Sequence, residues 1–187
     1  YVLLGRMDEA IAEHKRVDEL DPLVPGYSAQ FAGLYWWVGR YEEAIKQAQK
    51  VFEINPKGGV FAHYVLGRVH GDRGRYDEAI AEIQKAAAVS PGWKWALGPM
   101  YAAAGRTAEA RKVVAELKQQ KINRWHAYWL AQTYAALGEK DEAFRWLNYE
   151  RPHVWVPWLL TGKEPFLKPI RDDPRFRELQ VRMRVPH

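Results

Sequence analysis

Two histidines, His63 and His70, come nearest in type and spacing to a metal site. They are seven positions apart, so on a helix they would lie on roughly the same face. A zinc site needs ligands that converge, commonly at positions i and i+4 with a carboxylate or a cysteine close by, and the chain contains no cysteine. We therefore expect both histidines to pack inside the protein, and we predict no metal and no cofactor.

Glycines near arginines are a second pattern that could do chemistry. Gly67, Gly71 and Gly74 surround Arg68 and Arg73, which would suit a phosphate group. A phosphate-binding loop, however, lies between a strand and a helix, and no strand is predicted here. We interpret these glycines as turn and packing residues.

A motif of seven residues explains why such glycines recur. Gly74-Arg75-Tyr76-Asp77-Glu78-Ala79-Ile80 returns in altered form at Gly5, Gly39, Gly105 and Gly138. Successive glycines are separated by 34, 35, 31 and 33 residues. A period near 34 residues is typical of stacked helical hairpins.

Each copy of the motif follows one physical plan. Before the glycine, an apolar residue, a small residue and an aromatic residue or histidine share one face of a first helix. These sets are Phe31-Ala32 with Tyr35, Leu66-Gly67 with His70, Leu97-Gly98 with Tyr101, and Leu130-Ala131 with Tyr134. The glycine ends that helix, and acidic residues then begin a second helix, where they complement its positive end. An alanine is expected where the two helices cross: Ala10, Ala44, Ala79, Ala110 and Ala143.

Prolines predict where the second helices end. Pro22, Pro56 and Pro91 each come twelve residues after the motif alanine and stop the second helix. The expected helices span residues 7–20, 25–38, 41–54, 60–72, 76–89, 107–120, 124–137 and 140–149.

The hairpin after Pro91 is irregular. Its first helix is shortened by almost one turn, and Pro99 falls within it. We expect this helix to begin near Gly98, with Pro99 in its first turn, after an extended joint at Trp93-Lys94-Trp95.

The sequence resembles the tetratricopeptide repeat family over residues 1–150, because five copies agree on the glycine, the alanine and their spacing. It departs from the family where Ser28, His63, Lys94 and Ala127 replace the usual first-helix tryptophan, and where Ile122 stands in place of the closing proline. The resemblance implies an all-α helix-turn-helix solenoid of about four full repeats plus a partial N-terminal repeat. In that fold the first helices line a concave surface.

The acidic pairs argue against catalysis. Glu42-Glu43, Asp77-Glu78 and Asp141-Glu142 recur with the repeat, which identifies them as helix-start residues. Catalytic acids would interrupt the pattern instead of following it. No serine, histidine and aspartate are spaced as a nucleophilic triad, so we predict that this chain is not an enzyme.

The composition argues against some classes of binding partner. Net charge is +5, and the basic residues are mixed with acidic ones along the expected helices, so no nucleic-acid track is predicted. No apolar run reaches the length of a membrane span, and no signal peptide opens the chain. We expect a cytoplasmic protein without membrane contact in this region. Tyr1 corresponds to the middle of a first helix, so we expect further residues before it.

Aromatic residues are the best candidates for a binding site, because the chain has nine tryptophans and interface hot spots favour Trp, Tyr and Arg. Residues that flank the apolar-small pairs should point into the concave surface: Trp36, Trp37, Phe61, Tyr64, Arg68, Trp95, Trp125, Tyr128, Trp129 and Gln132. All of these except Trp37 and Phe61 are our predicted partner-binding residues. The alternative is that several pack against neighbouring hairpins or the tail.

The family's clamp for a chaperone's C-terminal carboxylate is not matched. Ala29, Gly33, Val65 and Ala96 occupy the positions where polar clamp residues are expected.

Residues 151–187 lose the period and are predicted to form a tail with a capping helix. Asp173 before Pro174 is typical of a helix start, and Phe176, Leu179 and Met183 should face the last hairpin. The tail is similar to the C-terminal end of bacterial signalling proteins, in which such repeats follow an adenylate or guanylate cyclase, a kinase or a winged-helix regulator domain. Alternatively, Trp155 or Trp158 of this tail fills the groove.

The sequence therefore predicts a non-catalytic module for protein–protein interaction, the regulatory arm of a larger bacterial signalling protein, that binds a peptide or protein segment. The protein's own N-terminal effector domain is one possible partner. Two alternatives stay open: a small-molecule or glycan sensor in the same groove, and an oligomerisation scaffold. A homodimer is also possible, because an incomplete first repeat would expose Ile11, Val17 and Leu20 or part of that face.

Overall fold

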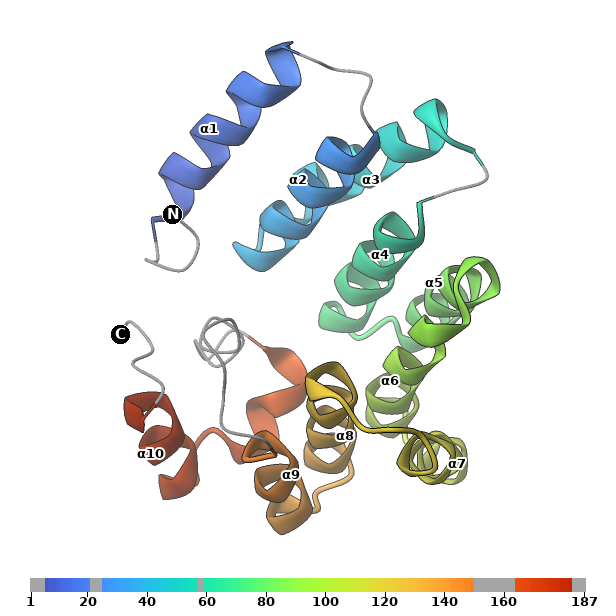
Figure 1. Cartoon of the computed structure of the whole chain (residues 1–187), viewed down its shortest axis with the longest axis vertical. Helices are drawn as coiled ribbons and strands as arrows, with labels where there is room; N and C mark the ends of the chain where they lie inside the picture. Colours follow the sequence, from blue (N-terminus) through green and yellow to red (C-terminus); the bar gives the residue numbers. More distant parts are fainter. Residues whose placement is uncertain (1–5, 21–24, 57–58, 150–163, 183–187) are drawn as a thin grey trace. The chain divides into compact units, whose positions relative to one another are not determined.

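The computed structural model describes residues 6–20, 25–56, 59–149 and 164–182 (Figure 1). In chain order the elements are α1 (Met7–Leu20), α2 (Pro25–Trp37), α3 (Tyr41–Ile54), α4 (Val60–Asp72), α5 (Tyr76–Val89), the 3₁₀-helix η2 (Pro91–Ala96), α6 (Leu97–Ala103), α7 (Thr107–Lys118), α8 (Arg124–Ala136), α9 (Lys140–Leu147), the 3₁₀-helix η4 (Pro165–Ile170) and α10 (Pro174–Arg182). Within those ranges there is no strand, and the all-α prediction is confirmed.

The chain divides into two compact units, Tyr1–Lys94 and Trp95–His187. In the first unit, α2 packs on α3, α4 packs on α5, and the first helices α2 and α4 also pack on each other. In the second unit, α6 packs on α7 and α8 packs on α9, while the first helices α6 and α8 contact each other. Each unit is therefore a stack of hairpins. The boundary expected between residues 150 and 151 lies outside the described residues.

The motif glycines end the first helices as predicted. Gly39, Gly74, Gly105 and Gly138 have φ angles between 74° and 80°, a left-handed conformation that strains any residue with a side chain. In each turn the next N–H donates to the carbonyl of the residue in the aromatic position. These bonds are Arg40 to Tyr35 (2.8 Å), Arg75 to His70 (2.9 Å), Arg106 to Tyr101 (2.8 Å) and Glu139 to Tyr134 (2.9 Å). The aromatic position thus also supplies the acceptor of a helix-ending motif.

Small residues allow the helices of a hairpin to approach closely. Ala44, Ala79, Ala110 and Ala143 are fully buried, as expected at the crossing points. A Cβ added at Gly67 would lie 2.8 Å from Cδ1 of Ile83 and 3.1 Å from the carbonyl oxygen of Ala79. The apolar-small pair is therefore a requirement of packing.

For the irregular hairpin, the predicted short helix is confirmed, and the predicted extended joint is wrong. Helix α6 has seven residues, against thirteen in α4, and begins at Leu97 with Pro99 in its first turn. The joint before it is not extended, because Trp93, Lys94 and Trp95 belong to η2. The tight 3₁₀ turn, in which the Trp93 N–H donates to the Ser90 carbonyl at 3.0 Å, carries the chain directly into α6.

The C-terminal elements η4 and α10 close the second unit. The Asp173 carboxylate accepts a hydrogen bond from the Arg175 backbone N–H at 3.1 Å, which confirms the predicted helix start. Phe176 and Leu179 of α10 are buried, as expected of a capping helix. Met183, residues 153–160 and the tail tryptophans Trp155 and Trp158 lie outside the described residues.

Two cationic contacts attach α10 to α9. The Arg175 guanidinium donates to Asp141 at 2.7 Å and lies 4.3 Å from the ring centroid of Phe144. Arg182 donates to the side-chain oxygen of Asn148. The cap is therefore held by polar contacts at its edge as well as by its apolar face.

The expected exposure of α1 is wrong for one residue. Ile11 is only 5% exposed, because α1 packs on α2. Val17 is half-buried, and Leu20 is 86% exposed. Among the described residues, no helix is long and apolar enough to span a membrane.

Candidate partner-binding surface

Three aromatic rings meet on the first-helix side of the first unit. Phe61 and Tyr64 of α4 and Trp93 of η2 have ring centroids 5.8 Å (Phe61–Tyr64), 4.8 Å (Tyr64–Trp93) and 6.1 Å (Phe61–Trp93) apart. All three are half-buried, so each keeps part of its ring surface in solvent. We call Phe61, Tyr64 and Trp93 the aromatic triad.

A buried layer supports the triad. The ring of Trp36, on α2, lies edge-on to Tyr64 with centroids 6.2 Å apart. The Arg68 guanidinium is 4.9 Å from the Trp36 ring centroid and is only 1% exposed, which is a buried cation–π contact. The structure therefore brings together three of the predicted residues, Trp36, Tyr64 and Arg68.

Asp72 orients this layer. Its carboxylate accepts hydrogen bonds from the indole N–H of Trp36 at 2.8 Å and from the Tyr41 hydroxyl at 3.3 Å. Burial, together with the negative charge of Asp72, raises the pKa of Tyr41. Sequence reasoning missed Asp72, but a signal was present: an acidic residue in the last turn of a helix opposes the helix dipole, which indicates a specific partner.

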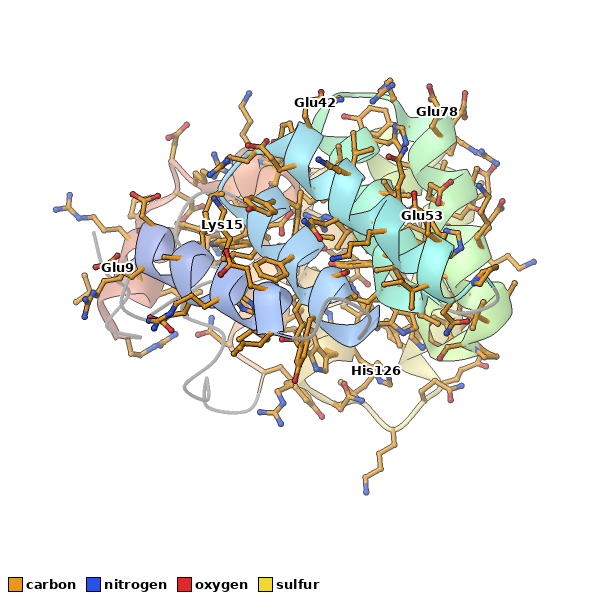
Figure 2. All side chains as sticks on the ribbon, turned by 90° about the horizontal axis from the view of Figure 1, so that it is seen from above. Glu9, Lys15, Glu42, Glu53, Glu78 and His126 are labelled. Carbon is orange, nitrogen blue, oxygen red and sulfur yellow. The ribbon has the colours of Figure 1, made fainter. Side chains whose placement is uncertain are left out.

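Charge is distributed unevenly between first and second helices. Helices α2 and α6 contain no Asp, Glu, Lys or Arg, and α4 contains only Arg68 and Asp72. The second helices α3 and α5 carry five and four such residues. Figure 2 shows Glu42 of α3 and Glu78 of α5 extending from the surface, and both are exposed. The first-helix side of the first unit is thus mainly apolar and aromatic.

The second unit has its own aromatic cluster around His126 of α8. The His126 ring centroid lies 6.3 Å from that of Trp95 and 6.3 Å from that of Trp129. Both tryptophans are buried, whereas Trp125 is half-buried. The Asn123 side chain caps α8 by accepting hydrogen bonds from the backbone N–H groups of Trp125 and His126. Burial lowers the pKa of His126.

Tyr128 of α8 is bound by the chain's own C-terminal segment. Its hydroxyl donates to the Glu164 carboxylate at 2.8 Å, and Glu164 is only 1% exposed. The other carboxylate oxygen accepts a hydrogen bond from the Phe166 backbone N–H at 3.2 Å, at the start of η4. Since η4 packs on α8, this part of the helix is covered.

Burial separates the predicted partner-binding residues into two groups. Tyr64 and Trp125 are half-buried. The buried group comprises Trp36, Arg68, Trp95, Tyr128, Trp129 and Gln132. Side chains in the buried group have little surface for direct contact with a partner. Trp93, which was not among the predicted residues, is half-buried and belongs to the triad, whereas Trp95 of the same 3₁₀-helix is buried.

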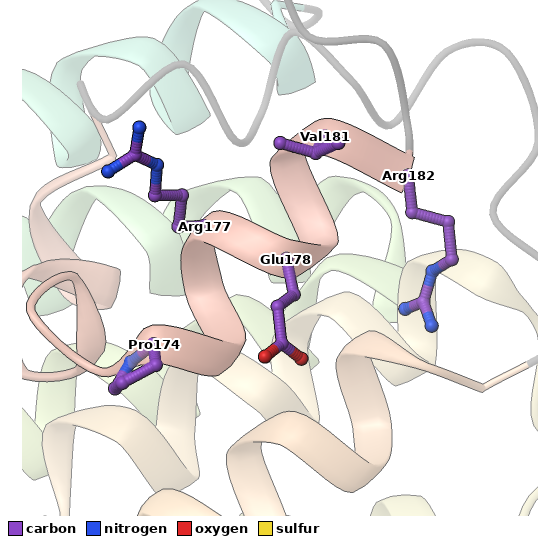
Figure 3. A pocket seen from close by; sticks show the side chains of 5 residues that line it. All are labelled: Pro174, Arg177, Glu178, Val181 and Arg182. Atoms are coloured by element: carbon purple, nitrogen blue, oxygen red, sulfur yellow. The ribbon is translucent and has the colours of Figure 1, made fainter.

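A shallow hollow of about 510 Å³ lies on the outer face of α10 (Figure 3). Its lining is Pro174, Arg177, Glu178, Val181 and Arg182. Figure 3 shows the side chains of Arg177 and Glu178 pointing apart, and the lining residues that the structure describes belong to α10. A small-ligand site is concave with convergent polar groups, and the described lining residues of this hollow do not converge.

Metal ligation is also tested by the geometry. In the part of the chain that the structure describes, no three His, Asp or Glu residues are close enough to hold a metal ion. His63 instead forms a contact with Glu82, with 2.7 Å between its Nδ1 and the carboxylate, and its ring lies 4.5 Å from that of Phe52.

Stacked hairpins with this turn define a class of repeat protein. Residues 64–124 and 124–148 match two family models that are both described as tetratricopeptide repeats. Residues 64–148 are therefore similar to tetratricopeptide repeats, whose stacked hairpins present an extended surface.

One solved structure supports the fold. A thermophilic tetratricopeptide repeat protein of Thermus thermophilus superposes with a TM-score of 0.65 at 18% identity, over 97% of this chain and 90% of that one. MamA gives a TM-score of 0.49 at 21% identity, over 76% of this chain and 85% of that one. The first likeness shows the fold alone. A search of curated protein sequences gave no match.

Proposed function

We propose that this chain is a non-catalytic protein–protein interaction module, and that the first-helix side of its first unit binds a protein segment. The aromatic triad carries the proposal. Its rings are half-buried and in mutual contact, and the buried Trp36 and Arg68 lie beneath them. Aromatic residues that are rigidly held and partly exposed are the usual anchors of protein interfaces.

Each predicted residue has a role in this proposal. Tyr64 contacts the partner together with Phe61 and Trp93, while Trp36 and Arg68 hold the rings in place. Among the predicted residues of the second unit, Trp125 is half-buried, whereas Trp95 of η2 and Tyr128, Trp129 and Gln132 of α8 are buried.

A peptide display experiment tests the proposal. Peptides are selected from a random library on the wild-type chain and are then titrated against Tyr64→Ala and Trp93→Ala. Each substitution should weaken binding by about tenfold or more, as expected at a hot spot. Tyr76→Ala is the matched control, because Tyr76 is also half-buried but lies on the second helix α5. Selected peptides that bind both triad variants as tightly as the wild type would refute this site, provided that circular dichroism shows unchanged helicity.

The wider role that we propose is that of a regulatory arm in a cytoplasmic signalling protein. The proposal is supported by the tail's resemblance to signalling proteins, carried by the segments that form η4 and α10. The test is the activity of the attached effector domain with and without the Trp93→Ala substitution. An effector whose activity never responds to the repeat array would contradict it.

A further inference from the structure

We infer that the aromatic triad recognises a proline-rich segment in the polyproline II conformation. The inference rests on the proposed function, because it specifies the partner of the same surface. Its basis is the way in which Phe61 and Tyr64 of the triad fill the space between α2 and α4, together with the charge of those helices.

The seam between α2 and α4 is closed by aromatic rings. A Cβ added at Gly33 would lie 2.8 Å from Cε1 of Phe61, so the Phe61 ring already occupies the position beside that glycine. One helical turn along, Trp36 and Tyr64 meet edge to face. A partner helix binds by inserting side chains into a groove, and these rings occupy the positions that it would use.

The triad presents partly exposed ring surfaces to a partner, and not a groove. The rings of Phe61, Tyr64 and Trp93 are all half-buried, and their centroids lie 4.8 to 6.1 Å apart, so three partly exposed aromatic rings are gathered at one place. Proline rings pack flat on aromatic rings, which is how proline-rich segments dock in known aromatic grooves. No deep hole is needed for that contact.

Charge on the surrounding elements fits an uncharged segment. Helix α2 has no charged residue, and the charges of α4 and η2 are confined to Arg68, Asp72 and Lys94. Two of these, Arg68 and Asp72, are committed to the Trp36 ring and its indole N–H. A proline-rich segment brings no side-chain charge that would have to be desolvated.

Both the aromatic triad and a polyproline II segment are rigid, which favours binding between them. The hydrogen bond from Trp36 to Asp72 and the cation–π contact of Arg68 fix the layer under Tyr64. A polyproline II helix is preformed and has no internal hydrogen bonds to break. Little conformational entropy is therefore lost when the two surfaces meet.

The probe for the test is a short polyproline peptide, titrated into the isotope-labelled full chain and followed by NMR. The expected shifts centre on Phe61, Tyr64 and the indole N–H of Trp93. Tyr64→Ala and Trp93→Ala should each weaken binding by about tenfold or more, whereas Tyr76→Ala should change it by less than about twofold. An alanine-substituted peptide of equal length should not bind.

Three outcomes would overturn the inference. The first is polyproline binding that is unchanged in both triad variants. The second is binding at the triad by an amphipathic leucine-rich helix but not by polyproline. The third is a set of library-selected peptides that bind at the triad when the polyproline peptide does not bind. In the second and third outcomes the proposed function survives, whereas selected peptides that bind elsewhere defeat both proposals.

Discussion

The first helices of the two units have the same origin in the repeat, yet they meet different surroundings. In the first unit, the rings of Phe61, Tyr64 and Trp93 remain half-buried. In the second unit, η4 packs on α8 and buries Glu164 against Tyr128. One first-helix side thus retains a partly exposed aromatic surface, and the other is used by the chain itself.

The second unit shows how a first helix of the repeat can serve in capping. A stack of hairpins needs a terminal element that covers its last apolar face. The chain meets that need with η4 and α10, and aromatic residues of α8 then contribute to stability. The aromatic triad of the first unit is half-buried, and it is the surface that we propose for partner binding.

The largest expected effect is on the cap. Phe176→Ala should lower the free energy of unfolding of the second unit by about 3–5 kcal/mol, because a large buried ring is replaced by a cavity. Urea denaturation followed by circular dichroism measures the change. Val181→Ala is the control on the same helix, since Val181 is 61% exposed. An equal effect of the two substitutions would show that α10 is not a cap.

Next in size is the hydrogen bond that joins α8 to the tail. Tyr128→Phe keeps the ring but removes the donor to Glu164, and should cost about 1.5–3 kcal/mol of stability. Tyr134→Phe, a buried tyrosine on the same helix, should change stability by less than about 0.5 kcal/mol. If both variants melt like the wild type, the contact with Glu164 does not hold the tail.

The requirement for a small residue where helices approach closely should hold in both units. Gly67→Ala and Gly98→Ala should each destabilise their unit by about 1–3 kcal/mol through overpacking. An added Cβ would lie 2.8 Å from Cδ1 of Ile83 in the first case and 2.5 Å from Oγ1 of Thr133 in the second. Gly92→Ala, with no atom within 4 Å, is the control. Thermal melts of the three variants would reveal any unit that tolerates the change.

A smaller loss of folding stability is expected when the pH is lowered. Burial lowers the pKa values of His14 and His70 in the first unit, and of His126 in the second, below the usual 6.5. The unfolded chain then binds more protons, so stability should fall as the pH decreases from about 6.5 through the lowered values. The urea midpoint as a function of pH measures this loss. His70→Phe should reduce it, and an unchanged pH profile would contradict the assignment.

The smallest effect on stability concerns α1. Leu20 is 86% exposed, and Leu20→Lys should change the free energy of unfolding by less than about 0.5 kcal/mol. We still expect the substitution to prevent pairing of two copies through α1. Light scattering over a range of concentrations is the measurement. A wild-type chain that stays monomeric throughout would rule out the dimer.

Local chemistry made the repeat predictable. The helix bounds expected for residues 7–20, 41–54, 60–72 and 76–89 agree with α1, α3, α4 and α5. Glycine, acidic residues and proline act within one or two turns of their own position, so their effects can be inferred from spacing alone. The buried alanines follow from the same period.

Only the tertiary structure decided which aromatic residues are exposed. Trp36, Tyr64, Trp95 and Trp129 are alike in sequence position, since all lie on first helices or the joint before one, but burial depends on what packs over them. The pairing of Tyr128 with Glu164 joins residues 36 positions apart, and no local rule links them. Spacing determined the hairpins, because their interactions are short-range. Contacts between distant segments determined the surface, because they depend on how the chain folds back on itself.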